Sequence, residues 1–265
     1  MNPANFSEIS KNYETNSVVQ KGASDILFEL LKIQSSENVL DLGCGPGHLT
    51  QKIKGITNGI VMGIDPSEGM IKKAKEKYID IEFLLSSAED INFQEKFDVI
   101  FCNSAFQWFE NPDLALKNCF NALKIRGRMG IQAPGGKIYS PNFREAIQKI
   151  KKHPELKDIF SHFKVPWLFR STADDYSNLF RDSRFTVTFA EIKTITTPYP
   201  PEKVFDIYKS GASAGYINQK YYDIPIDKEY QRKFLRTVEQ SFNEQAKNGM
   251  VNLTFNRIFL IAEKQ

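Results

Sequence analysis

This chain of 265 residues contains no apolar run long enough to cross a membrane, and neither sign of charge predominates. A membrane helix needs about 20 consecutive apolar residues, so we expect no membrane association. The 35 Lys and Arg residues are scattered along the chain and exceed the 32 Asp and Glu residues by only 3. The clustered basic patch typical of nucleic-acid-binding proteins is therefore missing, and we expect no nucleic-acid partner.

Cysteine and histidine are scarce, with 3 of each in the chain. Cys44, Cys102 and Cys119 lack CxxC spacing and fall in apolar segments, which is typical of small buried thiols in a reducing cytoplasm. The first residues lack the basic-then-apolar pattern of a secretion signal. We therefore expect a cytoplasmic protein without a metal site.

What the chain does contain is a series of apolar runs separated by amphipathic stretches. Strands that alternate with helices predict a doubly wound α/β sheet that is mostly parallel. The carboxyl ends of such strands meet at one edge of the sheet, where ligands bind. The five strand-like runs are Val39–Leu42, Ile60–Ile64, Ile81–Leu85, Phe97–Cys102 and Arg128–Gln132, and the helical stretches between them include His48–Gly55, Glu68–Tyr78 and Pro112–Lys124.

The stretch VLDLGCGPGHLT, residues 39–50, is the most informative part of the sequence. Its apolar run holds an acid, Asp41, and three glycines follow at alternate positions, Gly43, Gly45 and Gly47. Glycine allows the backbone to turn sharply and to approach a ligand closely. The helix that follows directs free N–H groups and its positive end back toward the turn. This arrangement predicts a nucleoside-binding loop.

The position of Asp41 separates two kinds of nucleoside ligand. A dinucleotide fingerprint places a pyrophosphate at the helix end with the spacing G-x-G-x-x-G, whereas here the third glycine comes one residue early. A carboxylate at Asp41 would repel a pyrophosphate but suits an α-ammonium and a sulfonium. The sequence therefore favours S-adenosylmethionine as the cofactor, and a methyltransferase as the function.

Further cofactor contacts are expected at the ends of the next strands. Asp65 follows the glycines by about 20 residues, the spacing at which an acid binds ribose hydroxyls; its alternative role is to cap the helix that begins near Ser67. Met70 is expected either on the adenine or in the core. The remaining predicted contacts are Pro66 beside Asp65, Ser87 and Ala88 at the adenine edge, where a simple turn is the alternative, and Asn103 near the methionine moiety.

Three motifs together resemble the class I S-adenosylmethionine-dependent methyltransferase family: VLDLGCGPGHLT, GIDPSEGMIKKAK and FDVIFCNSAFQWFEN, within residues 20–135. The resemblance implies a Rossmann-like sheet of seven strands with an antiparallel last strand, and residues 185–196 and 253–262 would supply strands six and seven. NSAFQWFENP, QAPGG and the carboxyl-terminal VNLTFNRIFLIAEK resemble the trans-aconitate methyltransferase family. The amino-terminal FSEISKNYETNSVVQKGASDIL resembles the malonyl-carrier-protein methyltransferases of biotin synthesis, except that Lys21 stands where they carry an arginine. Many relatives carry an aspartate before the Ala-Glu pair, and this chain has Ser87 at that position.

Both of these families make methyl esters of acids, which implies a small acid or an acyl-carrier-protein substrate. An ionised carboxylate needs no general base, and none of the three histidines is clearly placed as one. Positioning candidates are Tyr13, Gln107 and Trp108, and substrate-binding candidates are Tyr13, Trp108 and Arg170. Two alternatives stay open: methylation of a small-molecule hydroxyl, amine or carbon, and a non-catalytic module that binds S-adenosylmethionine. The oligomeric state is unknown.

The order of these segments predicts one methyltransferase domain, residues 1–265. Residues 1–35 form an amino-terminal cap, and residues 36–136 the cofactor-binding core. Residues 137–183 form a helical lid insertion over the ligand edge, and residues 184–265 complete the sheet with strands and helices. Within the last region, GASAGY at 211–216 is expected to break regular structure.

Overall fold

The structure is a computed structural model that describes the backbone from Val18 to Gln265 and the side chains from Gly22 onward. Tyr13 and the side chain of Lys21, both singled out in the sequence, lie outside the described part. The chain forms two compact units. The sheet unit comprises residues 19–137, 167–193 and 257–265, and the helical unit is built mainly from residues 138–166 and 194–256.

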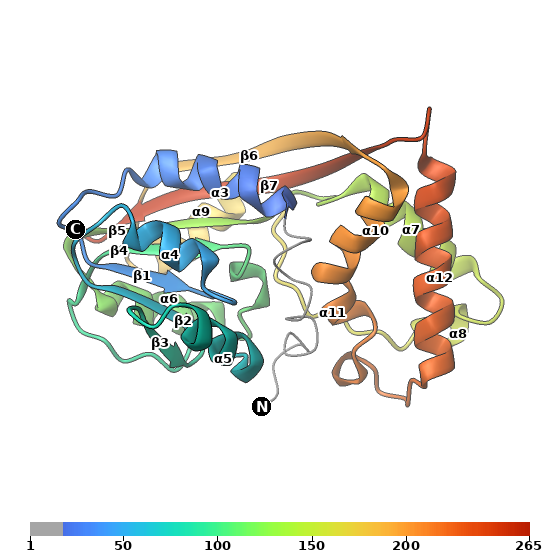
Figure 1. Cartoon of the computed structure of the whole chain (residues 1–265), viewed down its shortest axis with the longest axis horizontal. Coiled ribbons are helices and arrows are strands. Elements are labelled where there is room, and N and C mark those ends of the chain that lie inside the picture. Colours follow the sequence, from blue (N-terminus) through green and yellow to red (C-terminus); the bar gives the residue numbers. More distant parts are fainter. Residues whose placement is uncertain (1–17) are drawn as a thin grey trace. The chain divides into compact units, whose positions relative to one another are not determined.

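Seven strands form one sheet in the order β3-β2-β1-β4-β5-β7-β6 (Figure 1). Strands β1 to β5 pair in parallel, whereas β7 runs antiparallel to β5. The prediction of a mostly parallel α/β sheet with an antiparallel last strand is therefore confirmed. The strands are β1 (Val39–Leu42), β2 (Val61–Asp65), β3 (Glu82–Leu85), β4 (Phe97–Asn103), β5 (Leu123–Pro134), β6 (Thr186–Tyr199) and β7 (Val251–Glu263).

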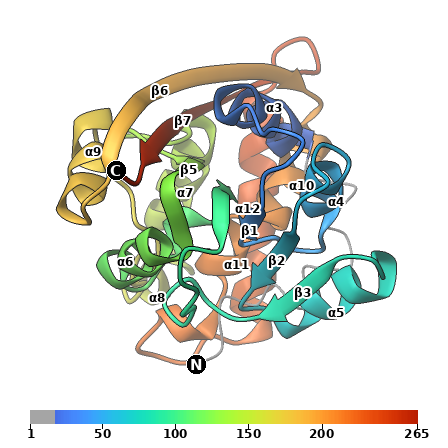
Figure 2. The same ribbon diagram turned by 90° about the vertical axis from the view of Figure 1, so that its left-hand side faces the viewer.

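Helices cover both faces of the sheet within the sheet unit (Figure 2). Successive side chains of a strand point to opposite faces. Val39 and its paired neighbours therefore pack against α3 and α4, and Leu40 and its neighbours pack against α6 and α9. On the same face as Val39, the ring of Phe83 on β3 packs against α5. The helices are α3 (Val18–Leu31), α4 (His48–Lys54), α5 (Glu68–Lys77), α6 (Pro112–Ala122) and α9 (Ala173–Asp182).

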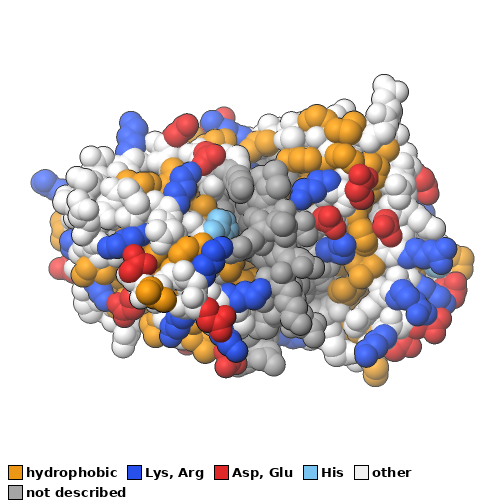
Figure 3. Space-filling model, viewed as in Figure 1, with side chains coloured by type: hydrophobic (Ala, Val, Ile, Leu, Met, Phe, Trp, Pro, Cys, Tyr) orange, Lys and Arg blue, Asp and Glu red, His pale blue; other side chains and the backbone are white. Residues whose placement is uncertain are grey.

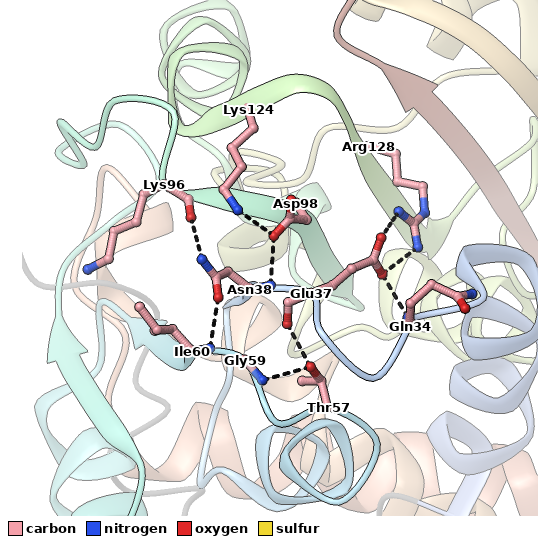
Figure 4. A network of polar contacts seen from close by, with 10 residues as sticks. All are labelled: Gln34, Glu37, Asn38, Thr57, Gly59, Ile60, Lys96, Asp98, Lys124 and Arg128. Carbon is pink, nitrogen blue, oxygen red and sulfur yellow. Dashed lines mark hydrogen bonds and ion pairs between the residues drawn. The ribbon is translucent and has the colours of Figure 1, made fainter.

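A polar network closes the amino-terminal edge of the sheet, opposite the carboxyl ends of the parallel strands (Figure 4). The Asn38 side chain donates to the Lys96 carbonyl oxygen (3.1 Å) and accepts from Ile60 N–H (2.9 Å). Asp98 accepts from Asn38 N–H (2.8 Å) and from Lys124 Nζ (2.7 Å). These hydrogen bonds pair the polar groups of Asn38 and Asp98 at the starts of the strands with other groups of the protein.

The helical unit has a core of its own, rich in aromatic rings. Phe143 on α7 packs against Tyr208, Phe242 and Phe255, with ring centroids between 5.0 and 5.6 Å apart. The expectation of a break at 211–216 is wrong in part, because residues 213–216 form a buried helical turn that packs in this core. The elements are α7 (Pro141–Lys152), α8 (Lys157–Phe160), α10 (Pro201–Ser210), α11 (Ser213–Tyr216), the 3-10 turn η3 (Gln219–Tyr221) and α12 (Lys228–Gln245).

The surface, the helices and the region boundaries add three observations. On the face seen in Figure 3, Lys and Arg side chains are interspersed with Asp and Glu. Among the described helices none is both long and apolar enough to span a membrane. The segment predicted as a lid divides between the units, since residues 138–166 belong to the helical unit and residues 167–183 to the sheet unit. Its predicted place over the ligand edge stays a prediction.

Candidate functional site

Asp41 lies in β1, close to the carboxyl edge of the sheet, and is almost fully buried, with 2% of its surface exposed. Thr50 on α4 donates its hydroxyl to Asp41 Oδ2 over 2.6 Å. Burial, opposed by this hydrogen bond and reinforced by the nearby charge of Asp65, raises the pKa of Asp41 to about 7. A buried carboxylate with one hydrogen bond keeps acceptor capacity for a cation. Thr50 was not predicted, because its contact with Asp41 depends on how α4 packs.

The glycine loop adopts the left-handed backbone that its three glycines were expected to allow. Gly43, Gly45 and Gly47 have φ values of +77°, +55° and +88°. A Cβ on Gly43 would lie 2.3 Å from the Ala105 Cβ, and a Cβ on Gly47 would lie 2.8 Å from the Phe83 ring. The loop is therefore held close to the segment that follows β4, and only glycine fits the first and third positions.

Asp65 connects this loop to the start of α5. Its Oδ2 accepts from Gly45 N–H (2.9 Å) and its Oδ1 accepts from Ser67 N–H (2.8 Å). Burial raises the Asp65 pKa to about 6, although both hydrogen bonds oppose that shift. Ser67 itself caps α5, with Met70 N–H donating to its hydroxyl. Each Asp65 oxygen retains a second lone pair, so ribose binding stays a prediction that these contacts permit.

The other residues predicted at the adenine edge differ in their burial and in their contacts. Pro66 is exposed and Met70 is buried. Ser87 donates its hydroxyl to Asp90 Oδ2 (2.7 Å), as in a simple turn, and Ala88 packs in the core. Their contacts with a cofactor stay predictions. Sequence reasoning missed the role of the next residue, Glu89, which accepts from the N–H groups of Glu110 and Asn111 and so fixes the start of α6.

A polar cluster lies at the carboxyl ends of β4 and β5. Gln132 is fully buried, and in the amide orientation that satisfies its neighbours it donates to Asn103 Oδ1 (3.1 Å) and Ser104 Oγ (2.8 Å). Its oxygen accepts from Arg257 Nη1 over 2.8 Å. Ser104 holds a left-handed φ of +57°, a conformation that costs a non-glycine residue backbone strain. Gln132 was not predicted, because its role arises only when β4, β5 and β7 come together.

Gln107 and Trp108 lie in the 3-10 turn η2 (Phe106–Trp108) beyond this cluster. Gln107 Nε2 donates to the Ser104 carbonyl oxygen (2.8 Å), and the Gln107 carbonyl oxygen accepts from Leu168 N–H (2.9 Å). The Trp108 ring lies edge-on to the Trp167 ring, with centroids 5.7 Å apart. The turn is thus joined to the segment 167–168, which comes from a distant part of the chain.

Arg170 lies beside the carboxyl end of β5. Its carbonyl oxygen accepts from Gly136 N–H (3.0 Å) and its N–H donates to Tyr176 Oη (3.3 Å). Tyr176 in turn donates to the Pro134 carbonyl oxygen (2.8 Å). The structure therefore places the predicted residues Asp41, Asp65 and Asn103 near the carboxyl ends of β1, β2 and β4. Gln107 lies in the turn that follows β4, and Arg170 lies beside the loop that follows β5.

Comparisons with known proteins agree with this arrangement. A family model described as a methyltransferase domain matches residues 33–184. The chain is 30% identical over 188 residues to malonyl-acyl-carrier-protein O-methyltransferase 1 of Ilyobacter polytropus, covering 69% of each protein. It is 24% identical to the enzyme of that description in Acetivibrio thermocellus, covering 98% of this chain and 92% of the relative. The YcgJ protein of Bacillus subtilis has a similar fold, with a TM-score of 0.61 at 15% identity, over 92% of this chain and 99% of that one.

Proposed function

The chain belongs to the methyltransferase family and is an S-adenosylmethionine-dependent enzyme, and we propose that its methyl acceptor is a carboxylate. The acceptor would belong to a small acid or to an acyl group on a carrier protein. The observation that supports the cofactor assignment most is the pair of carboxylates on either side of the glycine loop, Asp41, which is buried, and Asp65, which is partly buried.

The described residues fit S-adenosylmethionine, and each has a distinct role in the proposal. Asp41 would face the positive charge of the methionine end, because burial strengthens its attraction for a cation. Gly43, Gly45 and Gly47 have no side chain, so a ligand could approach the backbone of the loop closely. Asp65, already fixed by Gly45 and Ser67, would accept from the ribose hydroxyls. Asn103 would supply polar contacts near the methionine end.

S-adenosylmethionine, when bound, supplies a methyl group on a positively charged sulfur. The protein then has to align the acceptor, remove water from it and hold its negative charge. Arg170, which is half-buried and follows Trp167, Leu168 and Phe169 in the chain, is our candidate for that last task, since a guanidinium binds a carboxylate by two parallel hydrogen bonds. A carboxylate is ionised at neutral pH, so no residue needs to remove a proton.

The proposed acid substrate has its support in the relatives. Their names state a malonyl group on acyl-carrier protein as the substrate, and a malonyl group ends in a free carboxylate. A small acid of the trans-aconitate type is the second form of the same proposal. Trp108 and Trp167 would then form one wall of the acceptor site, where aromatic rings exclude water.

The cofactor assignment is tested with Asp65→Asn, which keeps the shape of the side chain. The dissociation constant for S-adenosylhomocysteine, measured by calorimetry, should rise at least tenfold. Asp98→Asn is the matched control, because Asp98 also accepts from backbone N–H but lies at the opposite edge of the sheet. Equal affinities in Asp65→Asn and the unaltered protein would exclude the ribose role.

The acceptor class is tested separately with a panel of candidate substrates. Methyl-ester formation from malonyl thioesters or tricarboxylic acids, detected by mass spectrometry, would support the proposal. Turnover of a hydroxyl, amine or carbon acceptor without any ester would replace the proposed carboxylate acceptor with that alternative class of acceptor. Tight binding of S-adenosylhomocysteine without turnover of any acceptor would favour a regulatory module.

A further inference from the structure

One buried polar atom beside the proposed site has no partner. Gln107 is only 7% exposed, and its Oε1 has no hydrogen-bond partner among the described residues. Its Nε2 is occupied by the Ser104 carbonyl oxygen at 2.8 Å. Rotating the amide by half a turn would set two oxygens against each other, so the contact with Ser104 fixes Oε1 as the free end. The side chain therefore presents an acceptor, not a donor.

The other side chains of the polar cluster at the carboxyl ends of β4 and β5 each have at least one partner. Asn103, Ser104 and Arg257 all bond to the Gln132 side chain. Native proteins leave few buried acceptors unpaired, because an unpaired one loses its bonds to water without replacement. The strained backbone of Ser104, at φ +57°, supplies the carbonyl oxygen that holds Gln107 in place. Fixed orientation and a missing partner together indicate a position prepared for a ligand atom.

The contacts of the segment around Gln107 indicate which ligand its Oε1 would face. Two residues before it, Ala105 lies against Gly43 of the glycine loop. On its other side, the Gln107 carbonyl oxygen binds Leu168 N–H, next to Trp167 and close in sequence to Arg170. Gln107 therefore lies between the loop assigned to the cofactor and the segment assigned to the acceptor.

We propose that Gln107 Oε1 accepts a hydrogen bond from an N–H or O–H group of the methyl acceptor. This inference rests on the proposed function, and it narrows the substrate class. A fully ionised carboxylate has no donor to offer, so the acid must carry a second group, an amide or a hydroxyl, near the carboxylate that is methylated. Gln107 is then a residue that determines specificity, since a substrate without the donor leaves Oε1 unpaired.

Two matched pairs of probe molecules test the proposal. Malonyl-pantetheine carries amide N–H groups, and a malonyl alkyl thioester of similar length carries none. Citrate and propane-1,2,3-tricarboxylate differ only by a hydroxyl. Binding of each probe to the protein saturated with S-adenosylhomocysteine is measured by calorimetry, and KM and kcat are measured for each probe that is methylated. Calorimetry keeps the test independent of turnover.

Gln107→Met removes the acceptor while keeping the length of the side chain. In at least one pair, the unaltered protein should bind the donor-bearing probe at least tenfold more tightly than its partner. Gln107→Met should abolish that preference by weakening the donor-bearing probe alone, and its affinity for S-adenosylhomocysteine should be unchanged. Asn38→Leu is the control, because it also removes an amide bonded to a backbone carbonyl, but at the opposite edge of the sheet. It should leave the preference intact.

Two results would overturn the proposal. A loss of S-adenosylhomocysteine affinity in Gln107→Met would assign Oε1 to the ammonium group of the cofactor. An equal effect on both members of each pair would show that Gln107 only supports the turn. Failure of the proposed function looks different, because the unaltered protein would then form no methyl ester from any acid.

Discussion

At the scale of single residues, the buried carboxylate of Asp41 makes the free energy of unfolding depend on pH. Burial raises its folded-state pKa from 3.8 to about 7, so the folded protein binds a proton that the unfolded chain releases. This contribution to stability is present below about pH 4 and is lost as pH rises to about 7. Ionised Asp41 therefore destabilises the ligand-free protein at neutral and higher pH.

Asp41→Asn should remove that dependence, since an amide has no charge to desolvate. We expect the variant to be more stable than the unaltered protein at pH 8, by up to about 4 kcal/mol for a shift of this size. At pH 4.5 the difference should largely vanish. Urea denaturation of the ligand-free protein at both pH values measures it, and S-adenosylhomocysteine affinity should fall in parallel. A stability difference that is the same at both pH values would contradict the assignment of the shift to Asp41.

The residues that the sequence revealed are those whose role is local. The spacing of Gly43, Gly45 and Gly47 indicated a tight turn, and all three have positive φ. Thr50, Gln132 and the unpaired oxygen of Gln107 could not be found in this way. The contacts of Thr50 and Gln132 join residues on different elements, and hydrophobic periodicity does not report such polar pairings. An oxygen without a partner leaves no pattern in the sequence.

At the scale of elements, the start of α6 depends on an acid from another loop. Glu89 Oε1 accepts from Glu110 N–H (2.9 Å) and Asn111 N–H (3.2 Å), and Asn111 is the N-cap of the helix. A carboxylate there satisfies free N–H groups and interacts favourably with the positive end of the helix. The contact also fixes the segment that carries Gln107 and Trp108.

Two substitutions of Glu89 separate these effects. Glu89→Gln keeps an acceptor oxygen and should lower the free energy of unfolding by about 0.5–1 kcal/mol, the usual size of a charge–helix interaction. Glu89→Ala removes the acceptor as well and should cost about 1–2 kcal/mol. Chemical denaturation at low and high salt measures both, and only the charge contribution should weaken with salt. Equal losses in the two variants would show that charge alone matters.

The parallel strands were predictable as elements because each is a short apolar run flanked by helical spacing. The elements later in the chain were harder to predict. β6 extends to Tyr199 and β7 begins at Val251, beyond the predicted ranges of 185–196 and 253–262. Polar residues within both strands, such as Thr194 and Asn256, pair across them. The helical turn at residues 213–216 was missed because Gly211 and Gly215 indicate a break, whereas burial of Tyr216 among other rings stabilises the turn.

At the scale of the whole molecule, the two units have separate cores and separate spectroscopic probes. Both tryptophans of the chain, Trp108 and Trp167, belong to the sheet unit. The helical unit has a cluster of tyrosines, in which Tyr208 is fully buried and its hydroxyl has no partner among the described residues. Tryptophan fluorescence therefore reports the sheet unit, whereas circular dichroism reports both.

We expect S-adenosylhomocysteine to stabilise the unfolding transition of the sheet unit, and a substitution of Tyr208 to stabilise that of the helical unit. S-adenosylhomocysteine at 100 times its dissociation constant should stabilise the tryptophan-monitored transition by about 2.7 kcal/mol. Tyr208→Phe removes an unpaired buried hydroxyl and should stabilise the helical unit by about 1 kcal/mol, a change seen by circular dichroism and not by fluorescence. If every perturbation moves both signals together, the two units unfold as one.

The rate at which the three cysteines are modified reports local opening of the sheet unit. Cys44, Cys102 and Cys119 are all buried, and burial raises the pKa of each thiol. A thiol reagent needs both access and the thiolate, so modification of the native protein waits for a transient local opening. Because Cys44 lies between Gly43 and Gly45, its modification rate measures local opening of the glycine loop. Slower alkylation of Cys44 alone in the presence of S-adenosylhomocysteine would support the proposal that the cofactor binds at this loop.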